Sequence, residues 1–422
     1  MMERIRVLVF LGIFAAMSGS AAAQTAADRA REEKIAAKCV SCHAKESPGI
    51  VNDWKASQHA RARVGCYDCH KAKKTDVDAQ AHKDILISVV VSPKDCSRCH
   101  PKEEREFSES HHAKATTFLR SETPKGRIMD NVLGYKVEGA AAARTGCEKC
   151  HGSKVEIGEN GTLTAATWPN TGIGRINPDG SKGACTACHT RHRFSVAEAR
   201  KPETCGSCHL GPDHPQIEIY LESKHGVIYT QEKDNWNWEI AGGHWDVQYY
   251  RAPTCATCHM SGIGDAEVTH NVSSRLSWKL APPRSEAREN WKENREAMQK
   301  VCLNCHSVNW VKGFYQQGDD AIKLYNEKFF DPMNAEMEKL YEEGLLTKEQ
   351  FDEEIEFKFF EYWHHEGRRA RMGVFMMGPD YAQWHGFYEL GRGKLELLGM
   401  IRELREKKAN GHGSTSEEMR KK

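Results

Sequence analysis

Every cysteine of the chain lies in the same short motif, Cys-x-x-Cys-His. The sequence has 16 cysteines, and eight copies of the motif use all of them. This spacing is typical of covalent c-type haem attachment, because two thiols can join the vinyl groups of one porphyrin while the histidine gives the iron an axial nitrogen. In chain order the copies are Cys39, Cys42 and His43; Cys66, Cys69 and His70; Cys96, Cys99 and His100; Cys147, Cys150 and His151; Cys185, Cys188 and His189; Cys205, Cys208 and His209; Cys255, Cys258 and His259; and Cys302, Cys305 and His306.

Three other uses of paired cysteines fit this pattern less well. A disulfide framework gives no reason for a histidine after every second cysteine. Structural zinc sites do not need that histidine either, and a redox-active Cys-x-x-Cys usually occurs once in a chain. The repetition therefore predicts eight covalently bound c-type haems, one for each motif.

The histidines outside the motifs are the candidates for second axial ligands. The chain has 21 histidines, so 13 remain after the eight of the motifs. Eight of them would be needed if every iron had two histidine ligands, and seven if one iron were open to a substrate. The local context favours His59, His112, His192, His225 and His270 as ligands.

The composition excludes two classes of protein and agrees with bound porphyrins. The 422 residues include 60 Lys and Arg against 59 Asp and Glu, so the basic excess of a dedicated nucleic-acid binder is missing. Only the first residues are strongly apolar, which argues against a polytopic membrane protein. The apolar fraction of 39% is low for a chain of this length, and porphyrins would add apolar surface to the core.

The first 23 residues resemble a secretory signal. Arg4 and Arg6 precede an apolar stretch over residues 7–17, and small residues at 21–23 predict cleavage near Ala23 and Gln24. We therefore expect an exported protein of a bacterial periplasm, with no membrane span in the mature chain.

The remaining chain is predicted to be mainly α, with two parts and a tail. Residues 24–284 should form a haem-binding domain of short helices and loops that carries motifs one to seven, because Cys, Cys and His at this spacing share a helical face. Residues 285–408 should form a C-terminal bundle of long helices with motif eight, and 409–422 a polar tail. Long helices are expected near 319–345, 347–372 and 380–408, the second starting with a capping box at Thr347.

Five segments give the chain a family resemblance. It resembles the octahaem hydroxylamine oxidoreductase family, which also includes hydrazine dehydrogenases and reductive relatives. The motif count alone is less specific, since octahaem tetrathionate reductases and electron-transferring cytochromes share it. The segments lie at 168–183 (WPNTGIGRINPDGSKG), 211–216 (GPDHPQ), 222–226 (ESKHG), 363–368 (WHHEGR) and 380–386 (DYAQWHG).

The resemblance implies an active site at the fourth motif. That motif would carry a catalytic haem with an open distal face, next to a proton-accepting pair at Asp213 and His214. The alternative for this pair is a turn residue followed by an ordinary axial ligand. A distal tyrosine would be Tyr250. Tyr381 would be the tyrosine that oxidative members join covalently to the catalytic porphyrin of a neighbouring subunit, which implies a homotrimer; the alternative is a core aromatic residue.

The resemblance also suggests how axial ligands pair. By similarity with pentahaem nitrite reductases, His270 would serve motif five, His111 or His112 motif six, and His225 motif seven. One of His364, His365 and His385 would serve motif eight. His59, His82 and His192 would then serve motifs one to three.

The function expected from this resemblance is oxidation of hydroxylamine or hydrazine at one five-coordinate haem, with seven bis-histidine haems carrying electrons to a cytochrome c or a quinone-linked cytochrome. One alternative is a reductive enzyme that converts nitrite or hydroxylamine towards ammonium. The other is a multihaem electron-transfer protein without catalysis.

Overall fold

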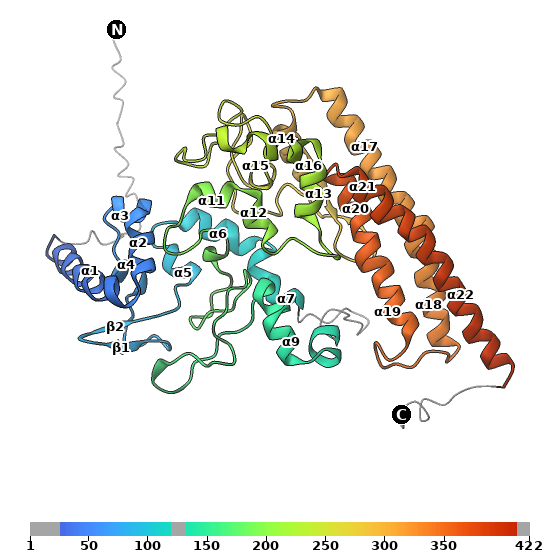
Figure 1. Ribbon diagram of the computed structural model, residues 1–422, viewed down its shortest axis with the longest axis horizontal. Coiled ribbons are helices and arrows are strands. Elements are labelled where there is room, and N and C mark those ends of the chain that lie inside the picture. The colour runs from blue at the N-terminus through green and yellow to red at the C-terminus, as the bar shows by residue number, and fades with distance from the viewer. Residues whose placement is uncertain (1–25, 120–131, 412–422) are drawn as a thin grey trace, which may run out of the picture.

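The computed structural model describes residues 26–119 and 132–411. The predicted signal segment and most of the predicted polar tail lie outside these residues. The chain runs from a group of short N-terminal helices at one end to a set of long C-terminal helices at the other (Figure 1). The prediction of a mainly helical fold with long helices at its end is confirmed.

The haem-binding part consists of short helices joined by long loops. Several helices coincide with motifs, so that Cys, Cys and His do share a helical face, as in α4, α10 and α15. The helices are α1 (Ala26–Glu46), α2 (Pro48–Ala56), α3 (Gln58–Arg61), α4 (Cys66–His70), α5 (Pro93–Cys96), α6 (Pro101–Glu109), α7 (Ala115–Leu119), α9 (Ala140–Thr145), α10 (Cys147–His151), α11 (Val196–Arg200), α12 (Pro202–Gly206), α13 (Gln216–Glu222), α14 (Lys224–Glu232) and α15 (Cys255–His259).

Side-chain caps fix where some of these short helices begin. Thr254 accepts a hydrogen bond from the backbone N–H of Thr257 at the start of α15, and Ser223 accepts one from Gly226 at the start of α14. Such caps satisfy N–H groups that a helix leaves unpaired at its first turn. Two small antiparallel sheets complete this part: β1 (Gln80–His82) with β2 (Ile85–Ile87), and β3 (Trp278–Lys279) with β4 (Glu286–Ala287).

The C-terminal helices form three long rods after α16 (Trp291–Cys302). Each rod contains a π-helical turn and packs its apolar face on a shared core, which includes Tyr325, Leu340, Tyr362 and Leu397. The rods are α17 (Val308–Leu324), η6 (Tyr325–Phe330) and α18 (Asp331–Glu342); α19 (Glu354–Glu361), η7 (Tyr362–Glu366) and α20 (Gly367–Phe375); and α21 (Pro379–Ala382), η8 (Gln383–Tyr388) and α22 (Glu389–Ala409).

Two predicted helix starts are wrong. The first rod begins at Val308, well before residue 319. The second begins after Glu353, because Phe351 has a φ of 61°, a left-handed conformation that no α-helix accommodates. The capping box is therefore formed by Glu353 and Glu356, while Thr347 donates its backbone N–H to Glu353 at 3.0 Å.

Glycines allow the second and third rods to approach closely. A Cβ at Gly386 would lie 2.5 Å from the Cα of Ala370, and one at Gly373 would lie 2.5 Å from the backbone nitrogen of Ala382. The two helices therefore touch at backbone distance, which fixes α20 against α21 and η8.

The segment at the predicted domain boundary is bound to the long rods. The carbonyl of Ala281 accepts from Nε of Arg368 at 2.8 Å, and that of Pro282 accepts from Arg371 at 2.9 Å. The carbonyl of Pro283 accepts from the hydroxyl of Tyr325 at 2.8 Å. Residues 281–285 therefore tie α20 to the haem-binding part. Among residues 26–119 and 132–411, no helix has both the length and the apolar character needed to cross a bilayer.

Candidate haem sites and active site

Most motif histidines face a second histidine across a constant gap. Within the described residues, seven pairs of histidine rings have centroids 5.9 to 6.4 Å apart. One of them joins His209 to His214, and the other six join a motif histidine to a candidate second ligand. These six pairs are His43 with His82, His70 with His192, His100 with His59, His189 with His270, His209 with His112, and His306 with His225.

This gap is the one that a shared iron requires. A metal–imidazole bond is about 2 Å long, so two rings on opposite sides of one ion have centroids about 6 Å apart. The donor set is also in the right protonation state, since burial lowers the pKa of His189, His209 and His259 to about 4. A neutral imidazole is the form that binds a metal. These residues therefore fit bis-histidine haems.

The pairing differs from the expectation at motifs seven and eight. His225 faces His306 of motif eight, where a C-terminal histidine was expected. The two rings are 6.1 Å apart, so α14 supplies the histidine that faces motif eight. His365 belongs to η7 and lies with His364, at a ring distance of 5.3 Å.

Of the two neighbouring candidates for motif six, His112 takes the position beside His209, with ring centroids 5.9 Å apart. His111 lies instead with its Nε2 2.9 Å from the Arg288 guanidinium, which occupies the nitrogen that an iron would need. The structure therefore places His112 beside the motif-six histidine and His111 beside Arg288.

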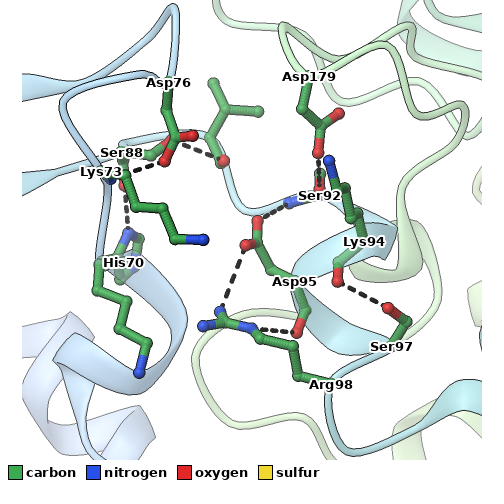
Figure 2. A network of polar contacts seen from close by, with 12 residues as sticks. His70, Lys73, Asp76, Ser88, Ser92, Lys94, Asp95, Ser97, Arg98 and Asp179 are labelled. Atoms are coloured by element: carbon green, nitrogen blue, oxygen red, sulfur yellow. Dashed lines mark hydrogen bonds and ion pairs between the residues drawn. The ribbon is translucent and has the colours of Figure 1, made fainter.

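Contacts to the Nδ1 nitrogen hold the rings of two motif histidines in a fixed orientation. Nδ1 of His70 lies 2.8 Å from the carbonyl oxygen of Ser88, in a polar network that also contains Ser92 and Asp179 (Figure 2). A hydrogen bond from Nδ1 leaves Nε2 as the nitrogen for a metal. Nδ1 of His209 is similarly placed, 3.3 Å from the side-chain oxygen of Gln216.

Sulfur contacts show which motifs are neighbours. A neighbouring thiol of another motif shifts the pKa of Cys39 (Cys66), Cys96 (Cys185), Cys150 (Cys208) and Cys205 (Cys255). Electrostatic contacts join Cys69 to Cys96, Cys188 to Cys205, and Cys258 to Cys302. The motifs therefore follow the order one, two, three, five, six, seven, eight, and motif four is attached to motif six.

Asp213 and His214 lie beside motif six, where the His214 ring is 5.9 Å from that of His209. Oδ1 of Asp213 is 2.7 Å from Nδ1 of His214, and the Asp213 charge acts on Cys150. Burial would raise the pKa of Asp213, but the close contact with His214 and the positive charges around it, including Arg368, hold that pKa well below its usual range. Asp213 is therefore a carboxylate that orients an imidazole.

The comparisons with known proteins agree with this geometry. A family profile described as "Seven times multi-haem cytochrome CxxCH" matches residues 62–353, which contain motifs two to eight. The chain belongs to this multihaem cytochrome c family. A second profile, "Cytochrome c554 and c-prime", matches residues 15–71. Membership implies covalently bound c-type haems at the motifs.

Relatives place this multihaem cytochrome near hydroxylamine oxidoreductase. A "Probable nitrite reductase-hydroxylamine oxidoreductase fusion protein" of Kuenenia stuttgartiensis is 26% identical over 372 residues, which cover 73% of this chain and 38% of the relative. The chain therefore spans about two-fifths of the length of that relative.

Solved structures show the same fold over nearly the whole cytochrome. A "Hypothetical multiheme protein" has a TM-score of 0.80 at 26% identity, over 89% of this chain and 96% of the other. A reducing HAO-like protein complex of Kuenenia stuttgartiensis has a TM-score of 0.66 at 20% identity, over 91% and 88%. The predicted resemblance to hydroxylamine oxidoreductase-like proteins is confirmed.

The two tyrosines predicted for the active site of the cytochrome lie in different places. Tyr250 is buried and stacks on Trp245 at 4.0 Å, beside motif seven, so the structure does not place it with Asp213 and His214. Tyr381 is partly exposed on α21, where its backbone N–H donates to Glu222 at 3.1 Å.

Sequence reasoning gave no role to the arginines of α20. Arg368 lies with its NH1 3.6 Å from Oδ2 of Asp213, and Nε of Arg369 donates to the Pro212 carbonyl at 2.9 Å. Arg368 ends one of the five family segments, but its contact spans more than 150 positions of sequence, so the segment alone could not reveal it.

Proposed function

We propose that the chain is an exported octahaem enzyme that oxidises hydroxylamine or hydrazine at its fourth motif. The observation that supports this proposal is the carboxylate–imidazole pair of Asp213 and His214, in which the charge of Asp213 acts on Cys150 of that motif. Such a pair can take up the protons that oxidation of a nitrogen hydride releases.

The residues of the pair have separate tasks in this proposal. Bound haems would supply the electron acceptors, and the order of motif contacts would connect motif four through motif six to both ends of the chain of haems. Oxidising a nitrogen hydride also releases protons, and imidazole is the side chain that exchanges protons near neutral pH. His214 would accept the proton at Nε2, while Asp213 holds the Nδ1 side of the ring.

A second candidate is the reductive direction, conversion of nitrite or hydroxylamine towards ammonium. The name of the curated relative includes nitrite reductase as well as hydroxylamine oxidoreductase. The same pair of residues could donate protons in that direction. In either direction the redox partner would be a cytochrome c or a quinone-linked cytochrome in the periplasm.

An exposed apolar stripe on the last rod supports the proposed homotrimer. Trp384, Tyr388 and Leu395 are 57%, 49% and 71% exposed, and they lie on one face because their spacing follows the helical repeat. Gly391 lies on the same face, and a Cβ there would meet nothing within 4 Å. Tyr381 is one turn before this stripe, so a trimer contact through it would carry that tyrosine towards a neighbouring subunit.

The proposal is tested by turnover of the purified, haem-loaded protein with hydroxylamine and oxidised cytochrome c. We expect rapid reduction of the acceptor, a high-spin signal from one haem, and subunits that remain joined on a denaturing gel through Tyr381. The Tyr381→Phe variant should separate into single chains and lose most oxidation. Low-spin signals from every haem, together with no turnover in either direction, would leave only the electron-transfer alternative.

A further inference from the structure

Three side chains of α20 hold the loop that carries Asp213 and His214. Arg368 faces the Asp213 carboxylate at 3.6 Å, Arg369 donates to the Pro212 carbonyl at 2.9 Å, and Met372 accepts from the Gln216 amide at 3.4 Å. The contacts lie before, at and after the pair, so the loop is fixed from one helix of the C-terminal domain.

Arg368 is itself held in place. Its Nε donates to the Ala281 carbonyl at 2.8 Å, and its guanidinium lies 5.4 Å from the centre of the Trp363 ring. The side chain is 11% exposed, and a buried guanidinium is costly unless a negative charge lies near it. Asp213 supplies that charge through Oδ2, while its Oδ1 faces His214.

Each oxygen of the Asp213 carboxylate thus faces a partner, His214 at Oδ1 and Arg368 at Oδ2. An aspartate with one contact can rotate about its side-chain bonds and take the imidazole with it. The contact to Arg368 removes this freedom of the side chain. The hydrogen bond from Arg369 to the carbonyl of Pro212 fixes the backbone just before Asp213. Catalytic groups need such support, since a displacement of about 1 Å can cost about 100-fold in rate.

We infer that Arg368 and Arg369 are positioning residues for the Asp213–His214 pair, so that the C-terminal helices complete the catalytic site. The inference rests on the proposed function, because it assumes that the pair acts in turnover. It goes beyond that proposal in assigning a task to α20, whose other evident role is to join the long rods to residues 281–285.

A double-mutant cycle separates positioning from a merely structural role. Arg368→Gln should lower kcat about tenfold and change KM less than about twofold. Asp213→Asn should lower kcat by about 100-fold. If Arg368 acts through Asp213, Arg368→Gln should change kcat less than about twofold in the Asp213→Asn background. Equal losses in both backgrounds would overturn the inference.

Three further variants test whether the effect is specific to the contact between Arg368 and Asp213. Arg368→Lys keeps the charge and should recover most of the lost kcat. Arg405→Gln is the matched control, because Arg405 pairs with Glu336 and Glu343 on the long rods, and it should keep full activity. If Arg368→Gln does not load its haems, Arg369→Gln tests the same inference, with an expected drop of about threefold that also disappears in the Asp213→Asn background.

Hydrogen exchange gives a readout that does not depend on turnover. Amides of residues 209–216 should exchange at least about tenfold faster in the Arg368→Gln, Arg369→Gln double variant than in the wild type or the Arg405→Gln control. Unchanged exchange would overturn the inference. If Asp213→Asn leaves kcat intact, the proposed function fails; if only Arg368→Gln leaves it intact, the positioning role alone fails.

Discussion

The first half of the described chain and the C-terminal rods build their interiors from different materials. In the described residues up to 200, the buried apolar side chains are alanines and valines: Val51, Val90, Ala113, Ala115, Ala143, Val155, Ala184 and Ala197. In the rods the buried set contains Phe, Tyr, Trp, Met and Leu in one continuous cluster.

The difference shows where stability must come from. Large buried side chains each contribute about 1.5 to 3 kcal/mol through burial, so the rods can support their own packing. Small side chains contribute less, and the first half depends on the apolar faces of porphyrins. A second apolar cluster, which includes Tyr229, Trp236 and Trp245, lies between the first 200 residues and the rods, so the dependence on haem is expected to be greatest in the first half.

The largest expected effect comes from removing a central haem. Cys205→Ala with Cys208→Ala removes the attachment at motif six, which contacts motifs four, five and seven. We expect loss of most haem and rapid proteolysis of the haem-binding part, while a fragment containing the three rods survives. Haem content and mass spectrometry of the digest measure this.

The matched control is motif one, at the end of the order of contacts. Cys39→Ala with Cys42→Ala should lose one haem and leave the remaining part resistant. If both double variants were equally sensitive, or if the rods were digested first, the comparison between the two interiors would be wrong.

A cavity in the core of the rods should destabilise the rods and leave the haem-binding part intact. Leu397 is fully buried, so Leu397→Ala should cost about 2 to 5 kcal/mol of stability in the rods. The haem spectrum at room temperature should stay unchanged, because no motif lies in this core. Thermal unfolding followed by far-ultraviolet circular dichroism measures the loss, and the exposed Lys407→Ala serves as the control.

The smallest effect concerns pH and the end of the second rod. Burial, and then contact with Asp352, raise the pKa of Glu353 to about 8. Because the folded state favours the protonated form, the contribution of Glu353 to stability is full below its ordinary pKa of about 4.5 and is lost as pH rises through about 8. Glu353→Gln should therefore raise Tm by roughly a degree at pH 9 and leave it unchanged at pH 4. A larger gain at pH 4 would contradict this.

How far the sequence predicts this molecule depends on the distance between interacting residues. The motifs are local, so the sequence alone predicts an attachment site at each of them, and it also predicted the fold class that the structure confirms. The partner of His306 was not predictable, because His225 lies 81 positions away and the count of spare histidines leaves several choices. The start of the second rod was missed because residues Thr347 to Gln350 fit a capping box. The left-handed backbone of Phe351 prevents a helix that starts there from continuing, so the helix starts after Glu353.

The pair of Asp213 and His214 was found through resemblance, and its support by Arg368 only through the structure. Nothing local marks Arg368 as different from Arg369 or Arg371. Long-range contacts of this kind follow from packing of α20 against the haem-binding part, which no local pattern encodes.

The most direct test of the account is hydroxylamine turnover by the Asp213→Asn variant. The account predicts a protein with full haem content, an unchanged low-spin spectrum and a kcat lowered by about 100-fold, because the imidazole of His214 loses the carboxylate that orients it. A variant with full haem content and the kcat of the wild type would contradict the assignment of Asp213 and His214 as the proton-accepting pair.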